Sequence, residues 1–186
     1  DLAACGCTSA DIARLRSLSG VDRVLPVLGI GGLSVRAGAR SGGAWGWAIG
    51  APADGDLLPV GPRALLKGSF DLGSVAAPQA VIDLDLARSL DVGIGDAIEP
   101  DFSGQPIRLE VAGITGPAGR FRGPTMVFLR ALVEPLIPAT SEITDAPYTE
   151  VFIAGPVAPD AVRALFPPGT TAVYTKAEQQ IGRAHV

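Results

Sequence analysis

Carboxylates are the residues of this chain best suited to chemistry, and they gather in the stretch 79–113. Six of them lie between residues 83 and 101, namely Asp83, Asp85, Asp91, Asp96, Glu99 and Asp101. A calcium site needs several oxygen ligands converging on one loop, and a glycosidase needs two carboxyl groups flanking the substrate. These six are spread over an expected strand, helix and turn, and their spacing selects no particular pair. We therefore interpret them as helix caps and turn residues, and we predict no metal site.

Most other catalytic and cofactor-binding motifs are missing from the sequence. The single histidine, His185, lies in the last six residues 181–186, which look like a translated sequencing adapter and are excluded from the interpretation. Without it, Ser-His-Asp and Cys-His catalysis and histidine-bound zinc are excluded. No GxxxxGK[ST] motif occurs, and the glycine run that starts at Gly29 does not complete GxGxxG because the third position falls on Ser34. We predict a flexible loop there, no cofactor, and a chain that is not an enzyme.

The two cysteines form the sharpest local motif, Cys5-Gly6-Cys7. One interpretation is a disulfide on the oxidising side of a membrane, either between Cys5 and Cys7 or with an upstream part of the protein. A second is a pair of small residues in a loop. A third is a lipoprotein cleavage box, with Cys5 lipidated. The candidate modification site of the chain is therefore the pair Cys5 and Cys7.

The tryptophans Trp45 and Trp47 could form an exposed binding edge together with Ile49. They alternate with Gly46, which places both rings on one face of an expected strand, Trp45–Ile49. That alternation favours an inward-facing position in the core over a binding edge.

Composition limits the class of protein. The chain has 186 residues, 47% of them hydrophobic, which is enough for one domain or two small subdomains with a real core. Its net charge of −4 argues against a nucleic-acid partner, because no basic face is evident. No apolar run reaches the ~18–20 residues that cross a bilayer. Since the sequence starts at Asp1 and not at Met, we expect that an upstream part is missing.

Helix and strand patterns predict a layout with both chain ends in one subdomain. The segments Ser9–Val27 and Ala158–Lys176 share one plan, a capped helix, a glycine turn and a strand, and could lie in one sheet. Between them, the stretch 79–113 predicts a strand, a helix at Leu84–Leu90 and a hairpin with arms Ala97–Glu99 and Ile107–Ile114. The predicted fold class is α+β, with a small α/β subdomain from residues 8–30 and 147–180 and an inserted β-rich subdomain from residues 31–146.

The stretch 79–113 also resembles the central segment of MacB-like periplasmic core domains, which belong to FtsX-type permeases of ABC transporters. The matching positions are Val81-Ile82, Leu86-Ala87, Leu90, Val92-Gly93, Gly95-Asp96 and Val111-Ala112-Gly113-Ile114. One departure is an extra Ile-Gly before Asp96. The matching residues specify turns and core positions, so the resemblance points to a fold and not to a reaction.

The resemblance implies a non-catalytic extracytoplasmic domain whose α/β subdomain is a membrane-proximal "porter" part. It implies transmembrane helices on both sides of the domain, a cytoplasmic ATPase subunit and a second permease subunit. The domain would couple ATP-driven membrane movements to the export of a lipid, lipoprotein, peptide or drug. Two alternatives are a cell-surface binding module or lipoprotein unrelated to transport and, less favoured, a β-barrel enzyme with converging carboxylates.

Overall fold

The computed structural model describes residues 2–117, 123–137, 148–167 and 172–174, and for 2–6 and 172–174 it describes the backbone alone. The chain divides into two compact units. The end unit consists of Asp1–Leu28 and Pro138–Val186, and the inserted unit consists of Gly29–Ile137. The excluded residues 181–186 lie outside the described residues.

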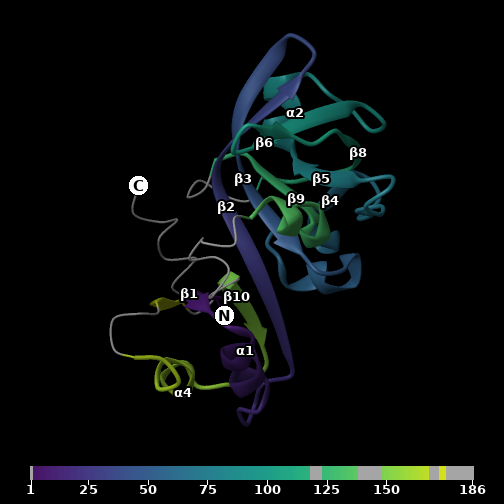
Figure 1. The fold of residues 1–186 in the computed structure, drawn as a ribbon. Coiled ribbons are helices and arrows are strands. Elements are labelled where there is room, and N and C mark those ends of the chain that lie inside the picture. Colours follow the sequence, from purple (N-terminus) through teal and green to yellow (C-terminus); the bar gives the residue numbers. More distant parts are fainter. Residues whose placement is uncertain (1, 118–122, 138–147, 168–171, 175–186) are drawn as a thin grey trace. The chain divides into compact units, whose positions relative to one another are not determined.

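Two β-α-β segments build the end unit (Figure 1). Their elements are β1 (Leu2–Cys7), α1 (Ser9–Arg16) and the first part of β2 (Arg23–Ala37), then β10 (Tyr148–Ala154), α4 (Pro159–Arg163) and β11 (Ala172–Tyr174). The strands form an antiparallel sheet in the order β11-β1-β10-β2. Each segment thus places one strand between the two strands of the other, which is the βαββαβ arrangement of ferredoxin-like folds. The predicted α+β class is confirmed.

Helix α1 begins where the sequence predicts because Thr8 and Asp11 form a capping box. The Thr8 hydroxyl accepts a hydrogen bond from the Asp11 N–H at 3.2 Å, and Asp11 Oδ2 accepts one from the Thr8 N–H at 2.8 Å. Burial raises the pKa of Asp11, but the hydrogen bonds from Thr8 and the guanidinium of Arg14 outweigh it and lower this pKa below 3.8. The ionised carboxylate therefore stabilises the start of the helix.

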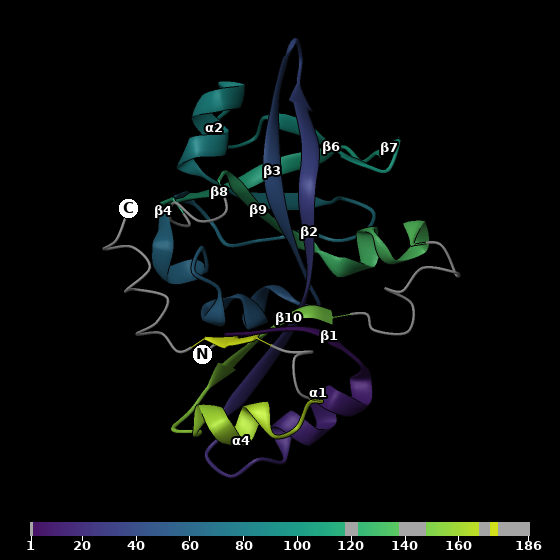
Figure 2. The same ribbon diagram turned by 90° about the vertical axis from the view of Figure 1, so that its left-hand side faces the viewer.

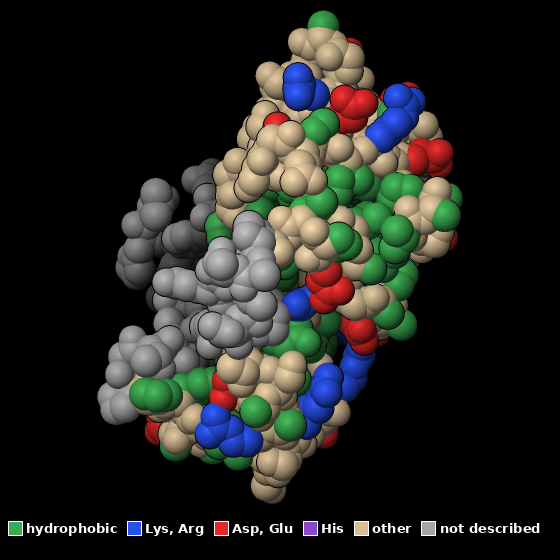
Figure 3. Space-filling model, in the orientation of Figure 1, with side chains coloured by type: hydrophobic (Ala, Val, Ile, Leu, Met, Phe, Trp, Pro, Cys, Tyr) green, Lys and Arg blue, Asp and Glu red, His purple; other side chains and the backbone are tan. Residues whose placement is uncertain are grey.

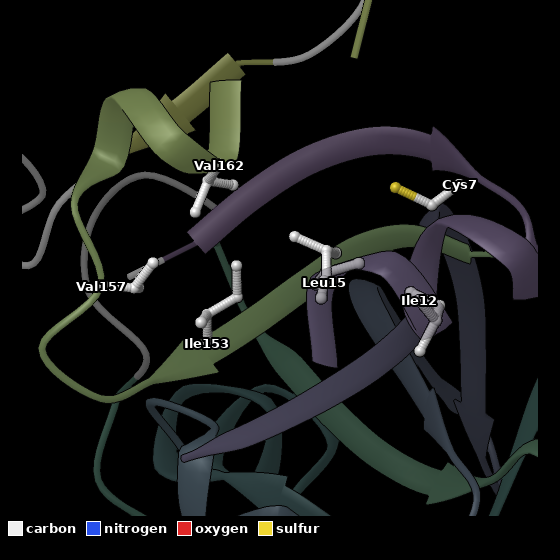
Figure 4. Close-up of a cluster of buried hydrophobic side chains, with 7 residues drawn as sticks. Cys7, Ile12, Leu15, Ile153, Val157 and Val162 are labelled. Atoms are coloured by element: carbon white, nitrogen blue, oxygen red, sulfur yellow. The ribbon is translucent and has the colours of Figure 1, made fainter. Parts of the chain in front are cut away.

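The core of the end unit joins both chain ends. Its buried residues are Cys7, Ile12, Leu15, Val151, Ile153, Val157 and Val162, with Leu165 and Phe166 packed against them. Figure 4 draws the seven buried side chains as sticks, where the helices and strands of the end unit meet. Val151 and Ile153 lie two positions apart on β10, so they point to one face of the sheet, the face that α1 and α4 cover (Figure 2).

The structure corrects two points for this region. One of the three interpretations of Cys5 and Cys7 placed them in a loop, but Leu2–Cys7 forms β1 because β10 and β11 supply partners on both of its edges. The glycine run from Gly29 was expected as a flexible loop, but it lies within the 15-residue strand β2. A Cβ on Gly31 would lie 2.8 Å from Cζ3 of Trp45, so this position lacks a side chain because the indole ring covers it.

The inserted unit contains most of the remaining strands. Its elements are β3 (Arg40–Ile49), η1 (Pro52–Leu57), η2 (Pro62–Ala64), β4 (Leu65–Gly68), β5 (Gln79–Asp83), α2 (Leu84–Leu90), β6 (Ala97–Phe102), β7 (Gln105–Pro106), β8 (Leu109–Thr115), β9 (Thr125–Leu129), η3 (Arg130–Leu132) and η4 (Glu134–Leu136). Its strands follow the order β2-β3-β9-β5-β8-β6, and β6 pairs back to β2 through Val35 and Pro100. The sheet therefore closes on itself as a six-stranded barrel, with β4 as an additional strand on β8.

Aromatic side chains fill the barrel. The rings of Phe102 and Phe128 meet edge to face with centroids 5.3 Å apart. Gly46 faces the same interior, because a Cβ there would lie 2.6 Å from Leu33 Cδ1 and 2.9 Å from Phe128 Cε1. Alternation of large and absent side chains allows these strands to close around the rings.

The elements predicted within residues 79–113 are largely present. Helix α2 spans Leu84–Leu90 as predicted, and Asp83 is its N-cap. The expected second hairpin arm Ile107–Ile114 is shorter, because β8 begins at Leu109 and the separate strand β7 occupies Gln105–Pro106. β8 also pairs in parallel with β5, a contact that a local hairpin pattern does not encode.

Candidate functional site

Asp83 is the most deeply buried carboxylate of the acidic stretch, with only 1% of its surface exposed. Its Oδ1 accepts a hydrogen bond from the Leu86 N–H at 2.8 Å, which caps α2. Its Oδ2 accepts two more, from the N–H of Thr125 at 2.9 Å and from the Thr125 hydroxyl at 3.0 Å. One side chain thus fastens the end of β5 to a helix and to the start of β9.

Burial determines the electrostatics of this carboxyl group. Desolvation raises the pKa of Asp83, and the hydrogen bonds from Leu86 and Thr125 oppose that rise without cancelling it. Thr115, the neighbour of Asp83 across β5 and β8, is fully buried, and its hydroxyl has no hydrogen-bond partner in the part of the chain that the structure describes. The groups bonded to Asp83 are two amides and a hydroxyl, an arrangement suited to fastening elements and not to proton transfer.

Most of the other acidic residues occupy turns or the ends of elements, but Glu99, which was also interpreted as a cap or turn residue, lies within β6 opposite Arg36 of β2. Asp91 is the left-handed C-cap of α2 and pairs with Arg40 at 3.0 Å. Asp96 Oδ2 accepts from the Gly93 N–H at 2.7 Å, and Asp101 Oδ1 accepts from the Gly104 N–H at 2.5 Å. Among the described residues, no three His, Cys, Asp or Glu side chains lie close enough together to hold a metal ion. Caps and turns therefore account for Asp91, Asp96 and Asp101, but not for Glu99.

An apolar surface lies beside β4, and we call it the β4 surface. Leu66 on β4 is 58% exposed, and Ile94, in the turn after α2, is 46% exposed. A Cβ on Gly68 would lie 2.8 Å from Ile94 Cδ1, so the Ile94 side chain rests on the bare backbone of β4. Figure 3 shows hydrophobic side chains gathered over the part of the inserted unit where Figure 1 places β4, β5 and β8. The β4 surface, defined by Leu66, Gly68 and Ile94, is suited to contact with an apolar partner.

The extra Ile-Gly before Asp96 was noted as a departure from the family pattern, but no surface role was expected for Ile94 or Leu66, although a signal was present. Ile94 stands between Gly93 and Gly95 in a turn, where a large aliphatic side chain is unusual and has no core to enter. The tryptophan pair, by contrast, is not an exposed edge. Trp47 is 2% exposed, and Trp45 is half-buried against Gly31.

In the end unit, the chain enters and leaves the sheet at neighbouring positions. Leu2, the first residue of β1, is paired with Tyr174, the last residue of β11. The two strands are antiparallel, so the backbone before Leu2 and the backbone after Tyr174 depart from the same end of the sheet. Among the described residues, no helix is long and apolar enough to cross a membrane.

The two cysteines lie at the end of β1. Cys7 is fully buried in the core of the end unit. The side chain of Cys5 lies outside the described residues, so the pairing of Cys5 with Cys7 stays a prediction.

Comparison with known proteins relates this fold to transporter domains. No family model matches the chain, and no curated protein matches it. Among solved structures, the extracellular domain of the ABC-type transporter YknZ from Gram-positive bacteria is 17% identical with a TM-score of 0.56, over 85% of this chain and 77% of that one. The periplasmic region of MacB from Actinobacillus actinomycetemcomitans is 13% identical with a TM-score of 0.60, over 100% of this chain and 92% of that one.

A third similar structure is a domain attributed to a permease of Porphyromonas gingivalis. It is 18% identical with a TM-score of 0.55, over 86% of this chain and 66% of that one. The fold of the chain is thus similar to that of extracytoplasmic domains of ABC-type transporters and permeases. The resemblance predicted from residues 79–113 is confirmed at the level of the fold.

Proposed function

We propose that this chain is a non-catalytic extracytoplasmic domain of an ABC-transporter permease. In this proposal the end unit is the membrane-proximal, porter-like part, and the inserted unit with its barrel is the part that meets the transported molecule. The similarity of the fold to the extracytoplasmic domains of YknZ and MacB supports the class of protein. The role of each unit is our inference from the geometry.

The observation that carries the proposal is the pairing of Leu2 with Tyr174. A domain that transmits movement from a membrane needs a rigid base to which the membrane segments are joined. The end unit supplies such a base, because hydrogen-bonded strands hold the entry and the exit of the chain side by side. Transmembrane helices joined to these paired strands would move the same end of the sheet together. Helices joined to two unpaired loops would instead move independently of each other.

The proposed partners follow from this role. The similarity to ABC-type transporter domains suggests that a cytoplasmic ATPase subunit supplies the energy through the membrane part, and that a second permease subunit completes the transporter. The extracytoplasmic substrate is a lipid, lipoprotein, peptide or drug. The β4 surface is the proposed contact, because the exposed apolar side chains of Leu66 and Ile94 can pack against the apolar parts of such molecules.

The side of the membrane on which the domain lies can be tested by labelling a single cysteine. The full gene product, with its flanking segments, is made with Cys5 and Cys7 replaced by alanine and with Val75→Cys, because Val75 is 60% exposed. We expect a membrane-impermeant maleimide to label Val75→Cys in spheroplasts, before lysis. A matched Val127→Cys variant is fully buried and should stay unlabelled until the protein is denatured. Labelling of Val75→Cys only after lysis would contradict the proposal.

The transporter role is tested separately, by asking whether an ATPase subunit purifies together with the protein. The same gene product, solubilised from membranes with a mild detergent, is expected to purify together with a subunit that hydrolyses ATP. A protein that is exposed outside the cell but purifies alone, with no ATPase activity in the membrane fraction, would favour the alternative of a cell-surface binding module.

A further inference from the structure

The cysteine motif of the end unit carries an inference that does not depend on the transport role. Cys7 is disulfide-bonded in the structure, and Cys5 is the one other cysteine of the sequence. We propose that Cys5 and Cys7 form an intrachain disulfide that staples the junction of β1 and α1. The end unit would then reach its full stability only after oxidation.

The register of β1 makes this short bridge feasible. Ala4 is opposite Glu150 and Cys7 is opposite Tyr148, so three steps along β1 cover two steps along β10. Two strand steps span about 6.7 Å, so each residue of β1 advances by only about 2.2 Å here. Residues two apart in this bulge are thus about 4.5 Å apart along the strand axis, whereas a regular strand would separate them by about 6.7 Å. Disulfides need Cα atoms roughly 4.4–6.8 Å apart. A regular strand would use the upper limit of that range, whereas the shorter advance in the bulge leaves room for the sideways displacement of its residues.

The position of Cys7 explains what the bridge would stabilise. Cys7 is fully buried among Ile12, Leu15 and Val151, and Thr8, the N-cap of α1, follows it directly. A link between Cys5 and Cys7 fixes the backbone that leads from the sheet into the capping box. Since the sulfur of Cys7 is excluded from solvent, the bond is protected from reductants in the folded state.

The bond forms by ordinary thiol–disulfide exchange. The thiolate of Cys5 attacks a disulfide of an oxidant, either a protein of the dithiol-oxidase class or a small-molecule disulfide, and releases one thiol of that oxidant. The thiolate of Cys7 then attacks the mixed disulfide, which forms the Cys5–Cys7 bond and releases the second thiol. Two protons and two electrons leave the cysteine pair and reduce the oxidant to its dithiol form. Such oxidants act in extracytoplasmic compartments.

Peptide mass measurement tests the bond directly. Arg14 is the first basic residue, so trypsin releases Asp1–Arg14 with both cysteines in one peptide. The chain is purified without reductant, treated with iodoacetamide while unfolded, and digested. We expect a peptide that carries no alkyl group and is lighter than the dithiol peptide by the mass of two hydrogen atoms. Reduction before alkylation should add two alkyl groups.

Two results would overturn the proposal. One is alkylation of both cysteines without prior reduction after exposure to an oxidised glutathione buffer. The other is recovery of the peptide linked to a second copy, which would show an intermolecular bond.

Thermal unfolding tests the stapling role. Reduction of the wild-type chain should lower its melting temperature by about 3–6 °C, as expected for a very short closed loop. The variant Cys5→Ala retains the buried Cys7 but cannot form the bond, so it should melt near the reduced wild type with or without reductant. If reductant changes the melting temperature of Cys5→Ala as much as that of the wild type, the effect does not come from this disulfide. If the oxidised and reduced wild-type chains melt at the same temperature, the bond does not staple the fold.

Discussion

Asp83 at the end of β5 accepts two hydrogen bonds from Thr125 at the start of β9, across 42 positions of the chain. The same carboxylate accepts a third bond, from the N–H of Leu86 in α2. A strand, a second strand and a helix of the inserted unit are therefore held by one buried side chain. The local motif alone would suggest only the helix cap.

We expect Asp83→Ala to lower the free energy of unfolding by about 2–4 kcal/mol, because it removes a cap and leaves buried donors of Leu86 and Thr125 without an acceptor. Asp83→Asn retains one acceptor oxygen and should lower it less, by about 1–2 kcal/mol. The control is Asp85→Asn on the exposed face of the same helix, which should change stability by less than about 0.5 kcal/mol. Urea unfolding measures all three, and equal losses for Asp83→Ala and Asp85→Asn would refute the fastening role.

Asp83 also predicts a pH dependence. Burial raises its pKa above the ordinary 3.8, so the folded state binds this proton more tightly than the unfolded state. Tighter proton binding by folded Asp83 contributes to the free energy of unfolding. This contribution is complete below pH 3.8 and is lost as the pH rises through the raised pKa of the folded state. The stability of the wild type relative to Asp83→Asn should therefore fall as the pH rises from below 3.8. Asp11, whose lowered pKa has the opposite effect, is kept in both proteins. A difference that grows with pH would contradict the prediction.

The capping box of α1 gives a prediction for the end unit. Thr8→Ala removes the hydroxyl that accepts from the Asp11 N–H, and it should lower the free energy of unfolding by about 0.5–2 kcal/mol. The matched control is Ser9→Ala at the next position, which is exposed and does not cap the helix, and which should be nearly neutral. Thermal unfolding of the two variants side by side decides whether the cap is made by Thr8 or by Ser9.

Gly113 on β8 is predicted to tolerate no side chain. A Cβ there would lie 2.3 Å from the backbone oxygen of Ser69, which cannot move without separating β4 from β8. Gly113→Ala should lower the free energy of unfolding by about 1–3 kcal/mol. Gly43→Ala on β3 is the control, because nothing lies within 4 Å of its Cβ position, and it should be neutral or slightly stabilising. Similar stabilities for the two variants would show that β4 does not approach β8 this closely.

The β4 surface gives a prediction that distinguishes an effect on binding from an effect on stability. The double variant Leu66→Ser/Ile94→Ser should change the free energy of unfolding by less than about 0.5 kcal/mol, because both side chains are largely exposed. It should nevertheless weaken the binding of a fluorescent apolar dye to the folded protein. Val75→Ser, which removes one exposed apolar side chain outside β4 and outside the turn of Ile94, is the control and should weaken dye binding less. Unchanged dye binding in the double variant would show that the two side chains form no joint apolar surface.

Local pattern predicted much of this protein. The helix at Leu84–Leu90, the start of α1 and the α+β class follow from caps, apolar spacing and β-branched alternation, all of which act over a few residues. The interpretation of Asp96 and Asp101 as turn residues also needed only local information, because their hydrogen-bond partners lie three positions away.

The remaining features depend on partners far along the chain. Leu2–Cys7 contains small residues without a clear strand pattern, and it is a strand because β10 and β11 pair with it. The closure of the barrel depends on Val35 meeting Pro100, and the exposure of Leu66 depends on β4 lying outside the closed ring. The sequence by itself determined which segments could be helices or strands, since that preference lies in each residue and its neighbours. Only the tertiary structure decided which strands pair and which apolar side chains stay outside, because these depend on the free energy of non-local pairing and burial.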